Sequence, residues 1–432
     1  MNTKSDILSS VKKYIEDQPK TPFVAGETYV PVSGATWSAE DIAQAVETLL
    51  ERWYDGRTSH EFERLLATIT KQRHVTFCNS GSSASLLAIS ALTSKELGNR
   101  RIKPGDEVIT VAAGFPTTVN PIIQNGLVPV FIDINLPQYN ALPNAIEEAI
   151  SHKTKAIFIA HTLGNPYKAR DVRDLCDRNE LWFISDNCDA LAARNHGEPL
   201  AHWADISTYS FYPAHHVSTM EGGAVSTNNP RLNKVIRSFR DWGRDCWCAP
   251  GHDNTCGKRF DWKLGDLPYG FDHKYTYSEI GYNLKSSDIH AALGVNQLKR
   301  LNQYITARND NWTYYRCMLD ELKEFFVMPE QAPYSEPSWF GFMLTVKENA
   351  PFSRRDIMTF LEEGKIGSRT LFAGNLTKHP AYQDVKYRIS DTLVKTDRIM
   401  RDGFWIGVYQ GITEQMREYV VEKFMEFCKR YK

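Results

Sequence analysis

The chain has 432 residues, of which 42% are hydrophobic and 24% charged, with a formal net charge of −1 at pH 7. This length allows two or three domains, and the composition is that of an ordinary globular protein. The near-zero charge excludes an overall field that would attract nucleic acid or an anionic membrane. The N-terminus has no apolar core, and no run approaches the ~18 apolar residues that span a bilayer. We expect a cytoplasmic protein.

Short β-rich runs alternate with helical patterns along the first half of the chain. The predicted strands are 106–113, 127–134, 155–162, 181–187, 206–212 and 222–228, and the predicted helices are 82–96, 116–124, 142–151 and 169–180. This alternation indicates an α/β fold with a mostly parallel sheet covered on both faces. Ligands bind beyond the carboxyl ends of such strands, so the candidate site residues are Phe115, His161, Asp186 and His215.

The chain changes character beyond the last of these strands. Residues 246–275 are rich in Gly, Pro, Asp and aromatic residues without a period, which predicts a long, ordered functional loop. Helical spacing returns over 286–325. We predict a helical segment over 1–60 that packs on a large domain over 61–310, followed by a small C-terminal α/β domain over 311–432.

Each candidate at a strand end also has an ordinary structural interpretation. The small hydroxyl residues of 78–88 could bind a phosphate at a helix N-terminus, or only cap the helix. Asp186 could pair with a protonated ring nitrogen or a metal, or open a turn. Phe115 could stack on a flat cofactor, or belong to the core. His215 and His216 could include a general base, or be polar turn residues.

The eight cysteines do not make a disulfide scaffold in a chain of this length. Cys246, Cys248 and Cys256 nevertheless crowd into eleven residues. With Cys188 they could form a four-thiolate site, although zinc sites favour C-x₂-C pairs and iron–sulfur clusters tolerate other spacings. Because cysteines are also good buried hydrophobes, the spacing alone leaves both interpretations open.

Six segments occur in the order typical of one family. They are "NSGSSASLLAISAL" (79–92), "GFPTTVNPI" (114–122), "FIDI" (131–134), "ISDNCDAL" (184–191), "SFYPAH" (210–215) and "GYNLKSSDIHAALGVNQLKRL" (281–301). Together they resemble the DegT/DnrJ/EryC1 sugar aminotransferases and dehydratases, which act on nucleotide-linked keto sugars with vitamin B6. The resemblance covers most of the chain. It implies the aspartate-aminotransferase fold, fold type I of the enzymes that depend on pyridoxal phosphate (PLP).

The resemblance also places His215 where the family's transaminases have a lysine. That lysine holds the PLP aldehyde as an imine, which histidine cannot form. The implied cofactor is therefore non-covalent pyridoxamine 5′-phosphate (PMP), with His215 as the acid–base catalyst. The implied cofactor contacts are Gly81, Ser82, Phe115, Asp186, Asp189 and Ser210, with Asn283 from the partner subunit of a homodimer. Arg369 and Asn375 are expected to contact the sugar nucleotide.

With the cysteines included, the pattern is similar to the nucleotide-sugar 3-dehydrases on the route to the 3,6-dideoxyhexoses of lipopolysaccharide O-antigen. This similarity implies a CDP-4-keto-6-deoxyhexose substrate and an external NADH-dependent flavin/iron–sulfur reductase. It also implies a [2Fe–2S] cluster on Cys188, Cys246, Cys248 and Cys256. One alternative is a related 3-dehydrase for a dTDP- or GDP-linked sugar, with or without a cluster. The other is a non-catalytic B6-binding protein.

Overall fold

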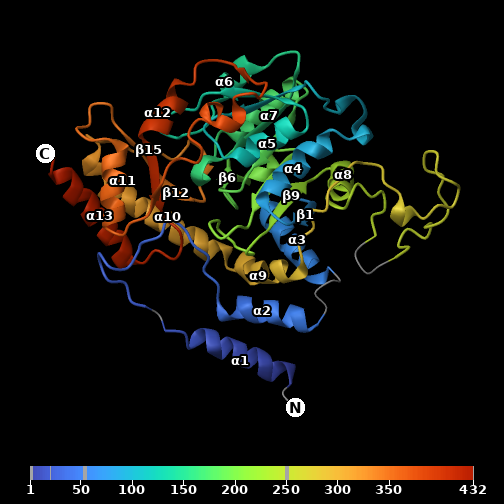
Figure 1. The fold of residues 1–432 in the computed structure, drawn as a ribbon, viewed down its shortest axis with the longest axis horizontal. Helices are drawn as coiled ribbons and strands as arrows, with labels where there is room; N and C mark the ends of the chain where they lie inside the picture. Colours follow the sequence, from blue (N-terminus) through green and yellow to red (C-terminus); the bar gives the residue numbers. More distant parts are fainter. Residues whose placement is uncertain (1–2, 20, 52–55, 249–252, 432) are drawn as a thin grey trace.

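The computed structural model describes residues 3–19, 21–51, 56–248 and 253–431. Its centre is an eight-stranded sheet with the order β1-β9-β8-β5-β4-β2-β3-β14 (Figure 1). The strands are β1 (His74–Cys78), β2 (Glu107–Val111), β3 (Val128–Ile132), β4 (Thr154–Ala160), β5 (Trp182–Asp186), β8 (Ile206–Ser210), β9 (Gly223–Thr227) and β14 (Arg388–Ile389). From β8 to β14 the neighbours are parallel, and β9 is antiparallel to both β8 and β1. The predicted mostly parallel sheet is confirmed.

Helices cover both faces of this sheet. The helices of this part are α4 (Gly81–Leu92), α5 (Pro116–Gln124), α6 (Pro143–Ala149), α7 (Ala169–Arg178) and α8 (Pro230–Arg240). Successive strand residues point to opposite faces. Accordingly, Ile109 and Ile157 pack in one buried cluster with α6 and α7, whereas Val108 and Phe158 pack in another with α4 and α8. The near-continuous apolar strands are thus explained by burial on both sides.

The six predicted strands are all present, within two residues at each end. The predicted helix over 82–96 ends at Leu92 and is followed by a 3₁₀ turn at Lys95–Arg100. The helical region over 286–325 is divided into α9 (Asp288–Lys299) and α10 (Leu301–Met318). Strand β1 was not predicted.

A second, antiparallel sheet lies in the C-terminal part with the order β10-β12-β15-β13. Its strands are β10 (Phe326–Val327), β12 (Gly341–Val346), β13 (Ser368–Arg369) and β15 (Gly403–Gly407), and its helices are α11 (Arg354–Glu363), α12 (Val394–Asp402) and α13 (Glu414–Lys429). The short strands β6 (Arg194–Asn195), β7 (Glu198–Pro199) and β11 (Ser335–Glu336) form a third sheet. The C-terminal region is therefore the smaller α/β unit that the pattern indicates.

Helices α1 (Lys4–Glu16) and α2 (Ala39–Leu50) lie outside the central sheet at the bottom of Figure 1. Helix α3 (Arg57–Thr70) lies above them against β1, where Phe62 packs on Phe77. Helix α2 packs on α9 through Ala45, Ala292 and Leu293. The segment between α8 and α9 extends away from the sheet (Figure 1) and has only a 3₁₀ turn at His273–Tyr275 among its described residues. None of the helices described is both long and apolar enough to span a bilayer.

Candidate active site

A cavity of about 530 Å³ opens where β2, β4, β5 and β8 end. The carboxyl ends of parallel strands meet at one edge of a sheet, and this edge is where α/β proteins bind ligands. The predicted residues that line the cavity are Gly81, Ser82, Phe115, Asp186, Cys188, Asp189, Ser210, His215 and Arg369. Four of the six quoted segments thus contribute lining residues, because the sheet brings them to one edge.

One end of the cavity is formed by the start of α4. Ser80 caps this helix by accepting a hydrogen bond from the Ser83 N–H at 3.1 Å. A Cβ atom at Gly81 would lie 2.4 Å from the Cβ of Ser210, so only glycine allows β8 to approach the helix this closely. The free N–H groups and the dipole of a helix N-terminus favour an anion. This end of the cavity therefore fits the phosphate of a B6 cofactor.

Asp186 lies at the deep end of the cavity, with 5% of its surface exposed. Its Oδ2 accepts a hydrogen bond from Thr118 Oγ1 at 2.7 Å, and its Oδ1 accepts one from the Cys188 N–H at 3.1 Å. No cationic side chain of the described residues forms an ion pair with it. A buried carboxylate of this kind fits a protonated ring nitrogen.

Phe115 comes directly before α5, and Pro116 starts the helix with its preset φ. Phe115 is 52% exposed although it borders the cavity, and its one ring contact with a described residue is edge-to-face with Phe372 at 6.0 Å. The flat face of Phe115 is thus available for stacking on an aromatic cofactor.

His215 lies beyond the end of β8, where its N–H donates to the Tyr212 carbonyl at 2.9 Å. Its Nδ1 is 3.6 Å from Oδ1 of Asp189, and both side chains are largely buried. Burial and the charge of Arg308 lower the pKa of His215 to about 3. Burial and the charge of Asp186 raise the pKa of Asp189 to about 8. His215 is therefore neutral near pH 7 and able to accept a proton.

Two other polar candidates lie outside this cavity. His216 is fully buried, and its Nε2 contacts the Ser338 carbonyl at 3.0 Å. His161 is also fully buried and stacks on Tyr167 at 3.8 Å, so its strand-end position reflects packing.

Two candidates implied by the resemblance also lie elsewhere. Asn375 is 1% exposed, donates to Asp397 at 2.6 Å and caps a 3₁₀ turn, so its amide is not available to a substrate in this conformation. Asn283 is exposed and accepts a hydrogen bond from Lys285 at 2.6 Å. Its proposed role concerns the cavity of a partner subunit.

The cysteines separate into two places. Cys246, Cys248 and Cys256 line a small cavity in the segment between α8 and α9. Cys188 instead lines the active-site cavity directly after β5, where burial and Asp186 raise the pKa of its thiol. Within the described ranges, no three Cys, His, Asp or Glu side chains are arranged to hold a metal ion. The four thiols are therefore not gathered at one site in this conformation, and the [2Fe–2S] cluster stays a prediction.

Several lining residues were not predicted. They are Tyr29, Thr117, Thr118, Tyr212, Glu221, Phe340, Phe372 and Trp405. Thr117, Thr118 and Tyr212 lie inside the quoted segments, so their closeness in sequence to Phe115 and His215 could have indicated that they line the cavity. Tyr29 and Trp405 come from distant parts of the chain, and no local pattern brings them to the cavity.

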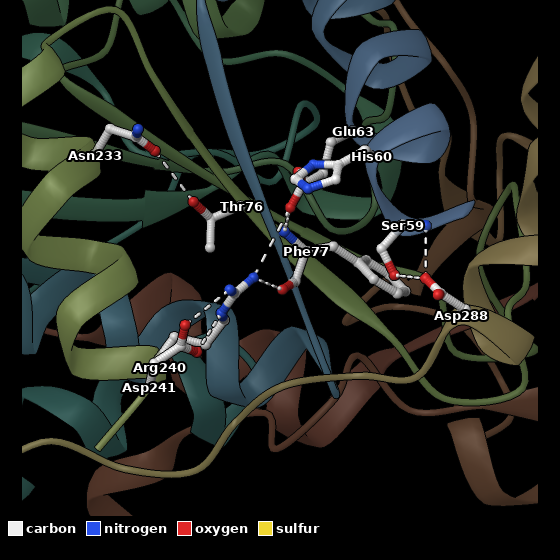
Figure 2. A network of polar contacts seen from close by, with 9 residues as sticks. All are labelled: Ser59, His60, Glu63, Thr76, Phe77, Asn233, Arg240, Asp241 and Asp288. Carbon is white, nitrogen blue, oxygen red and sulfur yellow. Dashed lines mark hydrogen bonds and ion pairs between the residues drawn. The ribbon is translucent and has the colours of Figure 1, made fainter. Parts of the chain in front are cut away.

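A polar network supports strand β1, which leads into the Gly81 turn (Figure 2). The Phe77 N–H donates to Glu63 Oε1 at 2.9 Å, and the Phe77 carbonyl accepts from Arg240 Nη1 at 2.9 Å. Glu63 and Arg240 also form an ion pair at 3.8 Å, and Asp241 holds the guanidinium through two further hydrogen bonds. A buried ion pair on α3 and α8 thus fixes the backbone just before the proposed phosphate site.

Residues 37–425 match the model of the DegT/DnrJ/EryC1/StrS aminotransferase family. The chain is 51% identical over 429 residues to "Lipopolysaccharide biosynthesis protein RfbH" of Salmonella typhimurium, covering 99% of this chain and 98% of that protein. It is 48% identical over 430 residues to "dTDP-4-dehydro-2,6-dideoxy-D-glucose 3-dehydratase" of Saccharopolyspora spinosa, covering 99% and 93%.

Among solved structures, the E. coli GDP-4-keto-6-deoxy-D-mannose-3-dehydratase with bound hydrated PLP is similar with a TM-score of 0.80. The identity is 24%, and the match covers 92% of this chain and 99% of that chain. This likeness confirms the predicted fold.

Proposed function

The chain belongs to the DegT/DnrJ/EryC1/StrS aminotransferase family, and we propose that it is a PMP-dependent 3-dehydratase of a nucleotide-linked 4-keto-6-deoxyhexose. The observation that carries the proposal is His215, a neutral, largely buried imidazole at the edge of the cofactor cavity. By resemblance, this is the position of the imine-forming lysine of transaminases. A base without a primary amine supports proton transfer but not regeneration of an imine.

Bound PMP would supply an amine that condenses with a 4-keto group and a ring that takes up an electron pair. Asp186 would hold the proton on the ring nitrogen, while Thr118 and the Cys188 N–H keep its carboxylate oriented. Phe115 would fix the plane of the ring. His215 would take the proton from C4′ through Nε2, because Nδ1 faces Asp189.

The two ends of the ligand would be bound by different groups. The Gly81–Ser82 turn and Ser210 would bind the cofactor phosphate, with Asn283 from the partner subunit of a homodimer completing that site. Arg369 lines the same cavity from the C-terminal sheet and would pair with the diphosphate of the nucleotide.

Replacing the 3-hydroxyl by hydrogen is a net two-electron reduction. The proposal therefore includes an external NADH-dependent flavin/iron–sulfur reductase. It also includes a [2Fe–2S] cluster, supported by the gathering of Cys246, Cys248 and Cys256 around one small cavity. Cys188 would complete that ligand set only if the segment between α8 and α9 came to the active-site cavity.

The proposed sugar carrier is CDP, as the sequence pattern implies, on a route to 3,6-dideoxyhexoses of lipopolysaccharide. A dTDP-linked keto sugar is the second candidate, favoured by the 48% identity to a protein named as a dTDP-sugar 3-dehydratase. GDP-linked sugars are supported less, since the "GDP-4-keto-6-deoxy-D-mannose 3-dehydratase" of Yersinia pseudotuberculosis is 28% identical.

The test is to incubate the chain with PMP, an artificial electron donor and CDP-, dTDP- or GDP-4-keto-6-deoxyhexose. Mass spectrometry should show loss of the 3-hydroxyl oxygen from one of them, and His215→Asn should abolish it. PLP should become trapped by borohydride in His215→Lys at residue 215 but not in the wild type. A trapped imine in the wild type, or full activity in His215→Asn, would contradict the proposal. Bound PMP without conversion of any sugar would indicate a non-catalytic B6-binding protein.

A further inference from the structure

The ring of His215 and the carboxyl group of Asp189 meet inside the active-site cavity. The distance from Nδ1 to Oδ1 is 3.6 Å, and the two side chains are 14% and 12% exposed. Nδ1 of His215 is buried and lacks a hydrogen-bond partner among the described residues. A buried ring nitrogen without a partner is costly, and the nearest acidic oxygen is that of Asp189.

Asp189 is held in place from two directions. It follows β5 by three residues, so its backbone is tied to the buried strand that also carries Asp186. The N–H of Leu163 forms a hydrogen bond to its carboxyl group and lowers the pKa of that group. Leu163 adopts a left-handed backbone with φ of 49°, a conformation that non-glycine residues rarely adopt. The strained turn thus aims an N–H group at Asp189.

His215 is held through its main chain. Its N–H donates to Tyr212, and its carbonyl accepts from Nη2 of the fully buried Arg308 at 3.2 Å. The ring contacts Phe340 at a centroid distance of 5.2 Å. These contacts fix the Cα position and one side of the ring. The Cys188 main chain forms a further hydrogen bond to the ring, whereas Nδ1 has no partner at hydrogen-bond distance among the described residues.

We propose that Asp189 is a positioning residue that hydrogen-bonds Nδ1 of His215 and thereby fixes the orientation and tautomer of its ring. A small rotation of the ring brings Nδ1 and Oδ1 within hydrogen-bond distance. With the proton on Nδ1, Nε2 is unprotonated and points away from Asp189. Nε2 can then take a proton while Nδ1 keeps its own proton and its hydrogen bond to Asp189.

The role of this pair in catalysis depends on the proposed dehydratase function, whereas the pairing itself does not. Asp189→Asn keeps the shape and a group able to hydrogen-bond Nδ1. Asp189→Leu keeps a similar volume without one. The first variant is therefore the matched control for the second.

The test is nuclear magnetic resonance of the full chain labelled with ¹⁵N-histidine, with the His215 signals identified by their loss in His215→Asn. Wild type and Asp189→Asn should show a single His215 tautomer. Asp189→Leu should show ring nitrogens averaged between both tautomers, as in a free imidazole. Identical His215 signals in wild type and Asp189→Leu would overturn the proposal.

Steady-state kinetics separate this proposal from the one on which it rests. With the converted sugar, Asp189→Leu should lower kcat by about 10–100-fold with little change in KM, and Asp189→Asn should restore most of it. An unchanged kcat in Asp189→Leu would overturn the positioning role although the dehydratase stands. Tautomer loss in Asp189→Leu without conversion of any sugar would support the pairing while refuting the proposed function.

Discussion

Glu63→Gln removes one charge from the buried network beside β1 and leaves its shape intact. The glutamine Oε1 can still accept the hydrogen bond from the Phe77 N–H, which lies at 2.9 Å in the wild type. What it loses is the attraction to Arg240 at 3.8 Å and to His60, whose Nδ1 is 3.1 Å from Oε2. The variant therefore isolates the electrostatic contribution of the pair.

The size of the effect follows from these distances. Two unit charges ~4 Å apart interact by about 4 kcal/mol at an effective dielectric constant of about 20. Asp241 already binds the Arg240 guanidinium at 2.8 and 3.1 Å, and glutamine avoids the cost of desolvating a carboxylate. We expect Glu63→Gln to lower the free energy of unfolding by about 2 kcal/mol. Glu63→Ala should cost about 3–5 kcal/mol, because it also strips the Phe77 N–H of its acceptor.

The effect should depend on pH. Burial alone would raise the pKa of Glu63, but the His60 hydrogen bond and the charges of Arg240 and Arg237 outweigh it and lower that pKa. A carboxylate with a lowered pKa stabilises the fold above its unfolded value of about 4.3, and this contribution is lost as the pH falls. The gap between wild type and Glu63→Gln should therefore narrow as the pH falls below about 5.

The assay is urea unfolding followed by circular dichroism and tryptophan fluorescence at several pH values from 7 to 4. Glu61→Gln on the same helix is the control, since the Glu61 side chain is 42% exposed and pairs with Lys299 at 3.4 Å. It should change stability by only about 0–0.5 kcal/mol. A Glu63→Gln variant as stable as Glu61→Gln, or a gap that stays constant with pH, would refute the reasoning.

Two further variants test the cofactor cavity and the cysteines. Gly81→Ala puts a Cβ atom 2.4 Å from that of Ser210, so its PMP affinity in equilibrium dialysis should fall at least about tenfold. Gly34→Ala, whose Cβ would meet Tyr409 at an ordinary 3.4 Å, should bind PMP as the wild type does. Equal PMP affinities of Gly81→Ala and Gly34→Ala would contradict phosphate binding at the Gly81–Ser82 turn. Anaerobically purified wild type should contain about two irons per chain, and Cys246→Ser should lose them while the exposed Cys317→Ser keeps them. One zinc and no iron would contradict the cluster.

The strands and strand-end residues were predictable because their signals are local. β2 to β5 are short apolar runs that the sheet buries on both faces, and Phe115, Asp186 and His215 each follow such a run. Parallel topology then brings these residues to one edge without further information.

The failures share a long-range cause. The five residues of β1 were missed because their strand character depends on pairing with β9, about 150 residues later. Asn375 carries an amide that could bind a ligand, but this amide donates a hydrogen bond to Asp397 on α12. For the cysteines, nothing in the spacing specifies how the segment after α8 folds relative to Cys188. The motifs thus predicted which edge of the sheet forms the site, but not every residue that contacts the cavity.

The main-chain N–H and carbonyl of Phe77 are both hydrogen-bonded to side chains, and this affects whether another strand can pair with β1. β1 forms one edge of the central sheet, and the free N–H and C=O groups of an exposed edge can form hydrogen bonds with a strand of another chain. Glu63 and Arg240 block this docking at Phe77, and the opposite edge, β14, is only two residues long. The main-chain groups of Phe77 are thus not available to an added strand, and the opposite edge offers only the two residues of β14. The buried ion pair therefore also limits the addition of a further strand at this edge of the sheet.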